Sequence, residues 1–428
     1  MRSKPMQLCE PLQTSVVPAA PADLPRATRR WGGPLRNHGL VTLILIAAFL
    51  SGCGRSGAPE PDAKTPEAKV APPISWPMTR GGAALSGGVA TTLPLNPSIA
   101  WTFAAGASVS AEAAILNGRV YVGTSKGTLY CLSAADGQEK WKFETKDAIT
   151  AAPAVTATMV FLSSNDGSLY ALKADTGTEV WRFSTDEKIS SGATLIKSPD
   201  GAEDWVVLNG YDGTTRVLKG ADGTVVWSYQ TEDYINGAPA VVDGRYIVFG
   251  GCDAQLHVIN VKDGSLVHRI PAEAYIPASI GTFGTMAFCG NYANQTVAFD
   301  VAAGTVAWVY EDRALPFFSS PAVNERLVLI GSRDKHLHAI DRKSGKNVWK
   351  FRTGGRIEGS PIVFNDGVLF GSSDGRLYAA SLEAGTEVWQ LDVGEPLIAS
   401  PAFGEQQIVV GGDKGTVFAI RGQPASNR

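Results

Sequence analysis

The hydrophobic pattern of this chain repeats about every 40 residues. Each unit holds four short strand-like runs, bounded by turn residues. In the second unit these runs cover residues 149–155, 159–163, 168–173 and 178–183. Four short antiparallel strands in a unit of this length predict one blade of a β-propeller.

A glycine followed four residues later by a tryptophan marks the last turn of most units. Gly177 and Trp181 are one such pair. Glycine suits a tight turn that needs a positive φ, and the large indole needs a buried surface to pack on. His268 takes the aromatic place in one unit, and successive anchors lie 40, 40, 46, 41, 40, 41 and 40 residues apart. We assign the tryptophans to structural packing: Trp101, Trp141, Trp181, Trp227, Trp308, Trp349 and Trp389.

The two ends of the repeat array complete one another. After Trp389 the chain supplies only three strands, at residues 397–403, 407–411 and 416–420, and the missing fourth is at residues 99–103. The prediction is an all-β, eight-bladed propeller closed by the N-terminal strand, which removes open sheet edges. The 46-residue interval is explained by an insertion at residues 197–204. One column of the third strands is small or apolar throughout and suits packing against a neighbouring blade: Cys131, Ala171, Val217, Val258, Ala298, Ala339, Ala379 and Ala419.

The first 75 residues differ from the repeats. An apolar run at residues 40–50 follows a basic leader and is too short to span a bilayer, which predicts a signal peptide over residues 1–52. The sequence Leu50-Ser51-Gly52-Cys53 resembles a bacterial lipobox, so we expect lipid on Cys53; the alternative is an ordinary signal peptide that ends near a cysteine. Residues 53–75 are rich in Pro, Ala and charged residues and predict a flexible linker, leaving 76–422 for the propeller.

Composition and charge exclude several classes of function. The chain has a formal net charge of −3 and becomes more acidic once its basic leader is removed, so nucleic acid is not an expected partner. The five histidines include one strand-face pair, His336 and His338, without a third metal ligand nearby. A disulfide between Cys252 and Cys289 is left open.

Two segments, ALKADTGTEVWRF (171–183) and AIDRKSGKNVWKF (339–351), resemble the tryptophan-docking repeats of pyrroloquinoline-quinone (PQQ) propellers. The resemblance covers residues 76–421. That superfamily includes quinoprotein dehydrogenases and BamB-type outer-membrane assembly lipoproteins, both eight-bladed. The opening Trp76-Pro77-Met78-Thr79-Arg80-Gly81 looks like that of many uncharacterised PQQ-like repeat proteins.

The resemblance to quinoprotein dehydrogenases implies PQQ, a calcium ion with oxygen ligands, a catalytic carboxylate and a pair of adjacent cysteines. This chain has no Cys-Cys pair. Glu358 is the sole carboxylate among the aligned positions that precede the innermost strands: Ser110, Thr150, Ser190, Asn236, Pro277, Phe318, Glu358 and Ile398. We therefore expect no enzymatic activity, no cofactor and no metal, with a PQQ- or metal-binding redox propeller as the alternative.

The other hypothesis is a protein-binding surface on one face of the ring. In an up-and-down blade, the loop between the second and third strands and the blade-to-blade segment emerge on the same side. Residue types vary there while the scaffold repeats, and several positions hold tyrosine or arginine, which dominate interface energetics. The candidate partner-binding residues are Tyr211, Tyr234, Tyr275, Tyr292, Arg313, Phe317, Arg333, Arg356 and Glu358. The alternative is that these aromatic rings only plug the channel.

The resemblance to BamB-type proteins implies envelope or outer-membrane proteins as partners, with a role in outer-membrane β-barrel assembly. In Gram-negative lipoproteins an aspartate after the lipidated cysteine commonly retains the protein in the inner membrane. Glycine occupies position 54 here, so the resemblance favours the outer membrane, facing the periplasm. We expect a lipid-anchored monomer.

Overall fold

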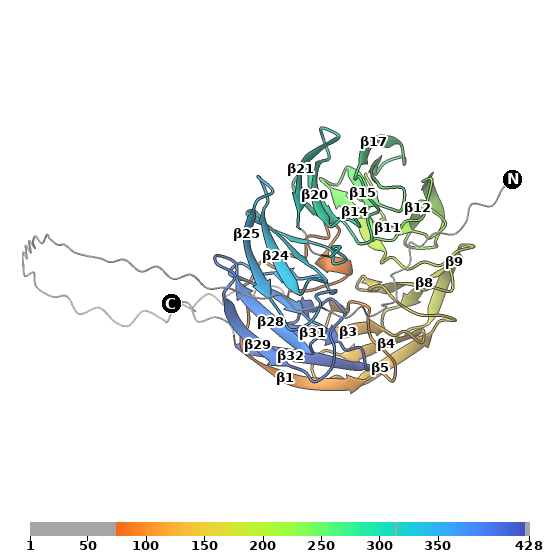
Figure 1. Cartoon of the computed structure of the whole chain (residues 1–428). Coiled ribbons are helices and arrows are strands. Elements are labelled where there is room, and N and C mark those ends of the chain that lie inside the picture. Colours follow the sequence, from red (N-terminus) through yellow and green to blue (C-terminus); the bar gives the residue numbers. More distant parts are fainter. Residues whose placement is uncertain (1–73, 313–314, 424–428) are drawn as a thin grey trace, which may run out of the picture. The chain divides into compact units, whose positions relative to one another are not determined.

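The computed structural model describes residues 74–312 and 315–423, which form a ring of eight four-stranded antiparallel sheets (Figure 1). In this part of the chain, helical structure is limited to the short 3-10 turn η1 (Thr79–Gly81). The all-β, eight-bladed prediction is confirmed.

Seven blades follow one another along the chain. Blade 1 is β2 (Ala114–Leu116), β3 (Arg119–Gly123), β4 (Thr128–Ser133) and β5 (Glu139–Glu144); blade 2 is β6 (Ala154–Val155), β7 (Met159–Ser163), β8 (Ser168–Lys173) and β9 (Glu179–Ser184). Blade 3 is β10 (Thr194–Lys197), β11 (Asp204–Asn209), β12 (Thr214–Lys219) and β13 (Val225–Gln230); blade 4 is β14 (Ala240–Val242), β15 (Tyr246–Gly250), β16 (Gln255–Asn260) and β17 (Leu266–Pro271). Blade 5 is β18 (Gly281–Phe283), β19 (Met286–Gly290), β20 (Gln295–Asp300) and β21 (Thr305–Glu311); blade 6 is β22 (Ala322–Val323), β23 (Leu327–Gly331), β24 (His336–Asp341) and β25 (Asn347–Arg352). Blade 7 is β26 (Ile362–Val363), β27 (Gly367–Gly371), β28 (Arg376–Ser381) and β29 (Glu387–Asp392).

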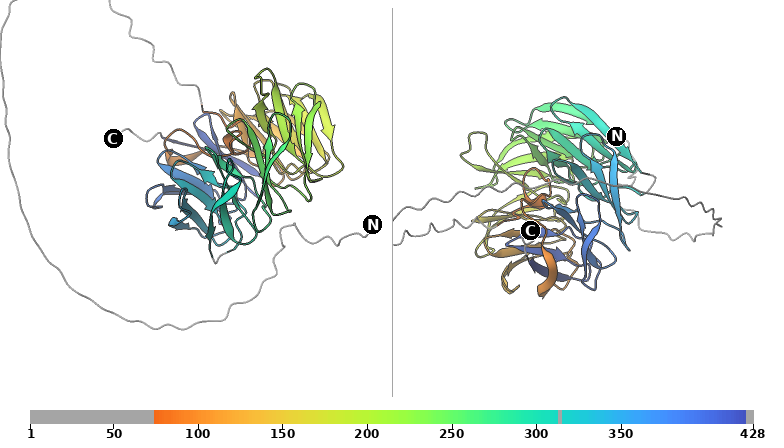
Figure 2. Two further views of the ribbon diagram at one scale, coloured as in Figure 1. Left: turned by 90° about the horizontal axis from the view of Figure 1, so that it is seen from above. Right: turned by 90° about the vertical axis from the view of Figure 1, so that its left-hand side faces the viewer.

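Blade 8 joins the two ends of the repeat array. Its strands are β30 (Ala402–Gly404), β31 (Gln407–Gly411) and β32 (Thr416–Gln423), completed by β1 (Leu95–Ala104). The orange β1 and the blue β32 lie side by side (Figures 1 and 2). Trp101 of β1 pairs with Ala419 of β32, which confirms the predicted closure. The innermost strands of blades 2 and 8 are shorter than predicted, since β6 and β30 begin five residues later than the predicted runs at 149–155 and 397–403.

Each anchor tryptophan connects its own blade to the next one. Trp141 lies opposite Cys131 within blade 1, and its indole N–H donates to the Ala174 carbonyl of blade 2 at 3.1 Å. The same ring covers Gly177, where an added Cβ would lie 2.5 Å from Trp141 Cε3 and where φ is +71°. The glycine of each repeat is therefore required twice, for the turn and for the preceding blade's indole. The other anchors donate in the same way, to the carbonyls of Ala134, Gly220, Val261, Arg342, Leu382 and Pro94.

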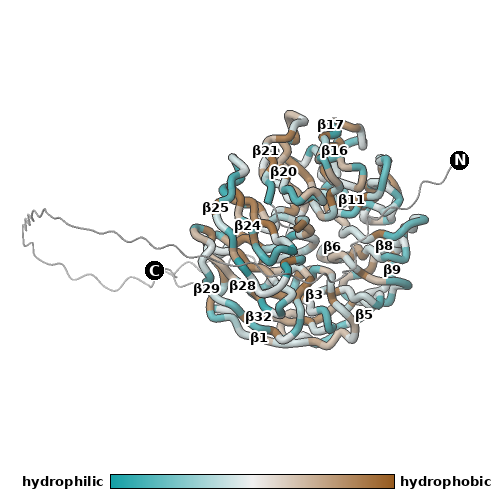
Figure 3. The backbone as a smooth tube through the Cα atoms, viewed as in Figure 1, coloured by the Kyte–Doolittle hydropathy of each residue, from teal (hydrophilic) through white to brown (hydrophobic). Residues whose placement is uncertain are grey.

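The core lies between the blades, where hydrophobic positions concentrate in strands such as β20 and β24 while much of the outer edge is hydrophilic (Figure 3). All eight residues of the small third-strand column are fully buried. Cys289 lies in this core as a free thiol, so it forms no disulfide with Cys252. The two cysteines occupy different places in their repeats, one in a strand interior and one in the turn after β15.

Residues 74–93 precede β1 and add a segment that the repeat pattern does not contain. Their backbone bonds one blade after another: the amides of Val155, Val241, Val323 and Val363 donate to the carbonyls of Pro77, Ala83, Ser86 and Gly87. Trp76 and Leu85 are fully buried along this path. The segment places η1 in the middle of the ring (Figure 1). It thereby closes one end of the central channel.

No helix among the described residues is long and apolar enough to cross a membrane.

Candidate functional site

The two variable loop columns predicted to share a face do meet there. The backbone amides of Tyr211 and Tyr292 donate to the carbonyls of Lys188 and Tyr275, each at 3.0 Å. Each bond joins the loop between a blade's second and third strands to the segment that leads into that blade. We call this side the loop face; it carries Tyr211, Tyr234, Tyr275, Tyr292 and Arg333.

One aromatic cluster on the loop face belongs to blades 3 and 4. The rings of Tyr211 and Tyr234 are stacked, with centroids 4.4 Å apart and planes at 14°. Lys188 Nζ lies 4.2 Å from the Tyr211 ring centroid, within cation–π range. Tyr234 is 39% exposed. The cluster is therefore a stacked pair of rings in which Tyr234 remains accessible to a partner.

A second cluster lies on blades 5 and 6. Tyr292 packs edge-on against Tyr275 and Phe318, with centroids 6.2 and 5.2 Å apart. The Arg333 guanidinium stacks 4.1 Å above Phe318, and its Nε forms an ion pair with Glu358 at 3.0 Å. Burial raises the pKa of Tyr292 against the opposing effect of Arg333. The cluster is thus held in place by its own contacts.

The remaining candidates divide into three groups. Arg356 is exposed and lies at the edge of the second cluster, 4.0 Å from Glu358. Phe317 is fully buried against Tyr310 and His338, so its prediction as a partner-binding residue is wrong. Phe317 and Phe318 are neighbours in the chain but contact different groups, and Phe318 is the one that joins the surface cluster. Arg313 and Cys53 lie outside the described residues.

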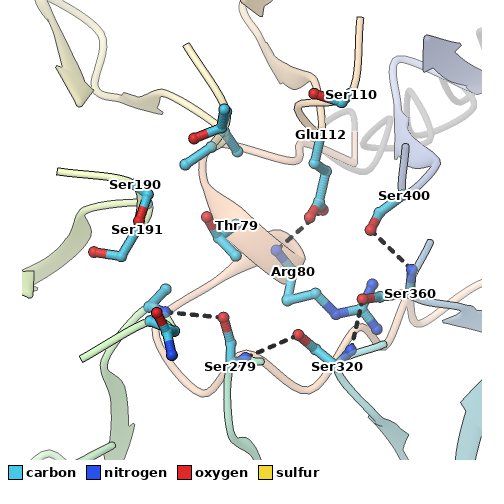
Figure 4. Close-up of a pocket in the computed structure, with 16 residues that line it drawn as sticks. Thr79, Arg80, Ser110, Glu112, Ser190, Ser191, Ser279, Ser320, Ser360 and Ser400 are labelled. Atoms are coloured by element: carbon cyan, nitrogen blue, oxygen red, sulfur yellow. Dashed lines mark hydrogen bonds between the residues drawn. The ribbon is translucent and has the colours of Figure 1, made fainter. Parts of the chain in front are cut away.

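The central channel contains a polar cavity of about 150 Å³ (Figure 4). Four of the aligned positions that precede the innermost strands line it: Ser110, Thr150, Ser190 and Asn236. Glu358 does not, because it is paired with Arg333 on the loop face. Polar side chains therefore line the channel on this half of the ring, and the one carboxylate of the aligned positions is not among them.

A chain of serine hydroxyls runs around the cavity. The backbone amides of Ala238, Ser279, Ser320 and Ser360 donate in turn to the hydroxyl oxygens of Ser279, Ser320, Ser360 and Ser400, at 2.9 to 3.2 Å. Each serine therefore connects its blade to the one before it, from blade 4 to blade 8. Because an accepting hydroxyl keeps its own proton, each can still donate a hydrogen bond.

The cavity also contains a buried pair of charged residues. Arg80 of η1 is 2% exposed and Glu112 is 7% exposed. The Glu112 carboxylate accepts from the Arg80 backbone N–H at 3.0 Å and from the Trp76 indole, while the Arg80 guanidinium donates to the Pro361 carbonyl. Burial raises the pKa of Glu112 to about 7, although Arg80 and Trp76 favour its charged form. Burial likewise lowers the pKa of Arg80.

Sequence analysis missed both members of this pair. Arg80 lies before the first repeat, so no aligned column contains it. Glu112 does have a sequence signal, because two positions after the aligned column that precedes the innermost strands it is the sole carboxylate among small residues: Glu112, Ala152, Gly192, Ala238, Ser279, Ser320, Ser360 and Ser400.

The histidine pair is part of the blade structure. His338 is fully buried and bonds Asp334 at 3.1 Å and the Tyr310 hydroxyl at 3.1 Å. Asp253 and His257 repeat this contact in blade 4, at 2.7 Å. Within residues 74–312 and 315–423, no three His, Cys, Asp or Glu side chains gather closely enough to hold a metal ion.

Comparison with known proteins gives two kinds of relative. In sequence, 68 residues are 38% identical to a quinoprotein ethanol dehydrogenase of Pseudomonas aeruginosa, a match of 16% of this chain and 11% of that protein. In structure, BamB from Moraxella catarrhalis aligns with a TM-score of 0.64 at 17% identity, over 76% of this chain and 99% of that one. The quinohemoprotein alcohol dehydrogenase from Comamonas testosteroni aligns with a TM-score of 0.68 at 13% identity, over 83% of this chain and 82% of that one. At these identities the structural likeness shows the fold alone.

A family model described as "Outer membrane protein assembly factor BamB" matches residues 87–198, 169–274, 212–321 and 293–426. Together the four matches extend over all eight blades. The chain therefore belongs to this family of PQQ-like propeller-repeat proteins.

Proposed function

We propose that this chain is a non-catalytic scaffold of the bacterial cell envelope that binds protein partners on its loop face during outer-membrane protein assembly. The observation that carries the proposal is the pair of aromatic clusters on that face, one around Tyr234 and one around Tyr275. Membership of the BamB family supports the assembly role.

The chemistry of the clusters suits protein binding. Tyrosine and arginine supply large contact area and hydrogen bonds at one site, and such residues carry much of the energy of protein interfaces. Stacking of Tyr211 on Tyr234 and of Arg333 on Phe318 fixes these side chains before a partner arrives. Less conformational entropy is then lost on association.

The proposal includes the cellular location. Lipid on Cys53 holds the chain to the outer membrane, and the linker predicted after this cysteine lets the propeller reach periplasmic partners as a monomer.

The test is a double substitution on the loop face, Tyr234→Ala with Tyr275→Ala. Both side chains are about two-fifths exposed and each has one aromatic contact, so their loss should lower the unfolding free energy by about 1–3 kcal/mol and leave the propeller folded. We expect the variant to lose the envelope proteins that crosslink to the wild type. The matched control is Val180→Ala with Val388→Ala, which removes equally exposed apolar side chains from the outer strands β9 and β29. Equal partner capture by both variants would contradict the proposal.

The redox alternative is favoured by the 38% identical segment and is tested separately. The cavity residues fit a calcium–PQQ site poorly. Glu112 is the sole carboxylate lining the cavity and already accepts two hydrogen bonds, and the Arg80 cation beside it disfavours a second cation. We expect no dye-linked alcohol oxidation after incubation with PQQ and calcium. Submicromolar PQQ binding would favour the alternative.

A further inference from the structure

The Arg80 side chain has hydrogen-bonding groups that the protein does not use. One terminal nitrogen of its guanidinium donates to the Pro361 carbonyl. Nε and the other terminal nitrogen have no hydrogen-bond partner, and neither does the hydroxyl of the adjacent Thr79. A buried polar group without a partner destabilises the folded protein, and more so when it is charged. These unpaired donors of Thr79 and Arg80 lie together in the described part of the chain, and a bound acceptor would satisfy them.

The protein holds Arg80 firmly in this costly position. Its backbone has φ +57°, a left-handed conformation that a non-glycine residue rarely adopts. Its side chain lies so close to Gly87 that an added Cβ there would overlap the guanidinium. The Glu112 bond to its backbone amide and the bridge between Trp76 and Ile115 fix the turn on both sides. Arg80 is therefore placed by several independent contacts.

The rest of the cavity suits a ligand with many oxygen atoms. Arg80 and Glu112 are the charged groups of its lining, and hydroxyl donors surround them on several blades: Ser110, Ser190, Ser279, Ser320, Ser360 and Ser400. A volume of about 150 Å³ has room for several water molecules or for one small solute.

The cavity is closed at one end and open at the other. Arg80, Glu112 and Ala152 are buried at its deep end, beside the N-terminal segment. A second layer of lining residues lies two positions earlier in the chain and nearer the loop face. In this layer Thr150 is exposed, and Ser110, Ser190 and Asn236 are half-buried. A solute therefore reaches the guanidinium from the loop face.

We propose that the channel binds a small oxyanion, of the size of phosphate or a short carboxylate, between the Arg80 guanidinium and the serine hydroxyls. The anion accepts from the unused guanidinium N–H groups and the Thr79 hydroxyl. Glu112 opposes it as a like charge and tunes the affinity. None of the residues of the two aromatic clusters lines the cavity, so anion binding and partner binding are tested by different variants.

The experiment titrates the full chain by calorimetry with sodium phosphate, acetate and malonate at pH 8, with chloride at matched ionic strength as the reference. Arg80→Gln should abolish binding, whereas Arg376→Gln, an exposed arginine outside the cavity, should bind as the wild type does. Glu112→Gln keeps an acceptor for Trp76 and Arg80 but removes the like charge, so it should bind on the order of tenfold tighter.

The anion affinities of the wild type and the two cavity variants test the proposal. Arg80-dependent binding of phosphate or of a carboxylate supports the site and tells which oxyanion it takes. If Arg80→Gln does not fold, the affinity of Glu112→Gln for the anion is the test, and binding tighter than that of the wild type supports the proposal. Equal heats in the wild type and Arg80→Gln overturn it, as does a Glu112→Gln variant that binds no more tightly than the wild type or not at all.

Discussion

At the scale of single residues, the buried pair Arg80 and Glu112 has the largest measurable consequence. Glu112 is surrounded by the N-terminal turn and by uncharged residues of the channel, and Arg80 is its one charged neighbour in the cavity. Its folded-state pKa of about 7 lies above the ordinary value of 4.5. The unfolded chain therefore releases this proton first as the pH rises, and ionised Glu112 costs stability in the folded state.

We predict that Glu112→Gln changes the pH dependence of stability. In the wild type, Glu112 does not lower the unfolding free energy below about pH 4.5, where its carboxyl is protonated in both the folded and the unfolded chain. It lowers the unfolding free energy progressively as the pH rises to about 7. The unfolding free energy of the wild type relative to the variant should thus fall between pH 5 and pH 8, by up to about 3 kcal/mol. Urea unfolding of both proteins at the two pH values measures this change. A difference that does not vary with pH would contradict the raised pKa.

His268 gives a second prediction at this scale. It replaces tryptophan in blade 4, pairs with Val258 and covers Gly304 of blade 5 as the indoles cover their glycines. His268→Trp should restore the indole donor toward the Val301 carbonyl and raise stability by about 1 kcal/mol. His268→Phe adds a ring without a donor and should gain less. A melting temperature of His268→Trp below that of the wild type would show that this interface has adapted to histidine.

At the scale of secondary-structure elements, β1 has the greatest importance because it pairs along β32 and closes the ring. A chain that begins at residue 105 lacks β1 and exposes the edge of β32, whereas a chain that begins at residue 94 lacks only the N-terminal segment. We predict that the shorter chain loses cooperative melting and aggregates, while the longer one still melts cooperatively. Identical melting of the two chains would contradict closure by β1.

The same two elements show what could be predicted from sequence. β1 was predictable because Trp101 belongs to the repeat and blade 8 lacks one strand. Residues 74–93 were not, because they have no repeated counterpart and their partners, such as Pro361 and Val363, are distant in sequence. Tyr211, Tyr234, Tyr275 and Tyr292 were predictable as a surface because they vary where the scaffold repeats. The orientation of Phe317 depends on one residue of register, which composition does not reveal.

At the scale of the whole molecule, attachment to the membrane is the first question. Acyl chains contribute about 0.8 kcal/mol per buried methylene, so a multiply acylated Cys53 would be a lasting anchor. We predict that Cys53→Ala is released from membranes by mild washing while its propeller melts as in the wild type. Membrane fractionation measures the release. Equal retention of the variant would contradict lipid attachment at this residue.

The central claim, that the loop face binds a protein partner, is tested most directly by site-specific photocrosslinking in the native envelope. A photoreactive phenylalanine derivative replaces Tyr275 on the loop face in one variant and Val388 on the outer strand β29 in another; the two side chains are 41% and 43% exposed. We predict one discrete adduct from position 275, lost when Tyr234→Ala is added, and none from position 388. Adducts of equal yield from both positions, or from position 388 alone, would contradict the account.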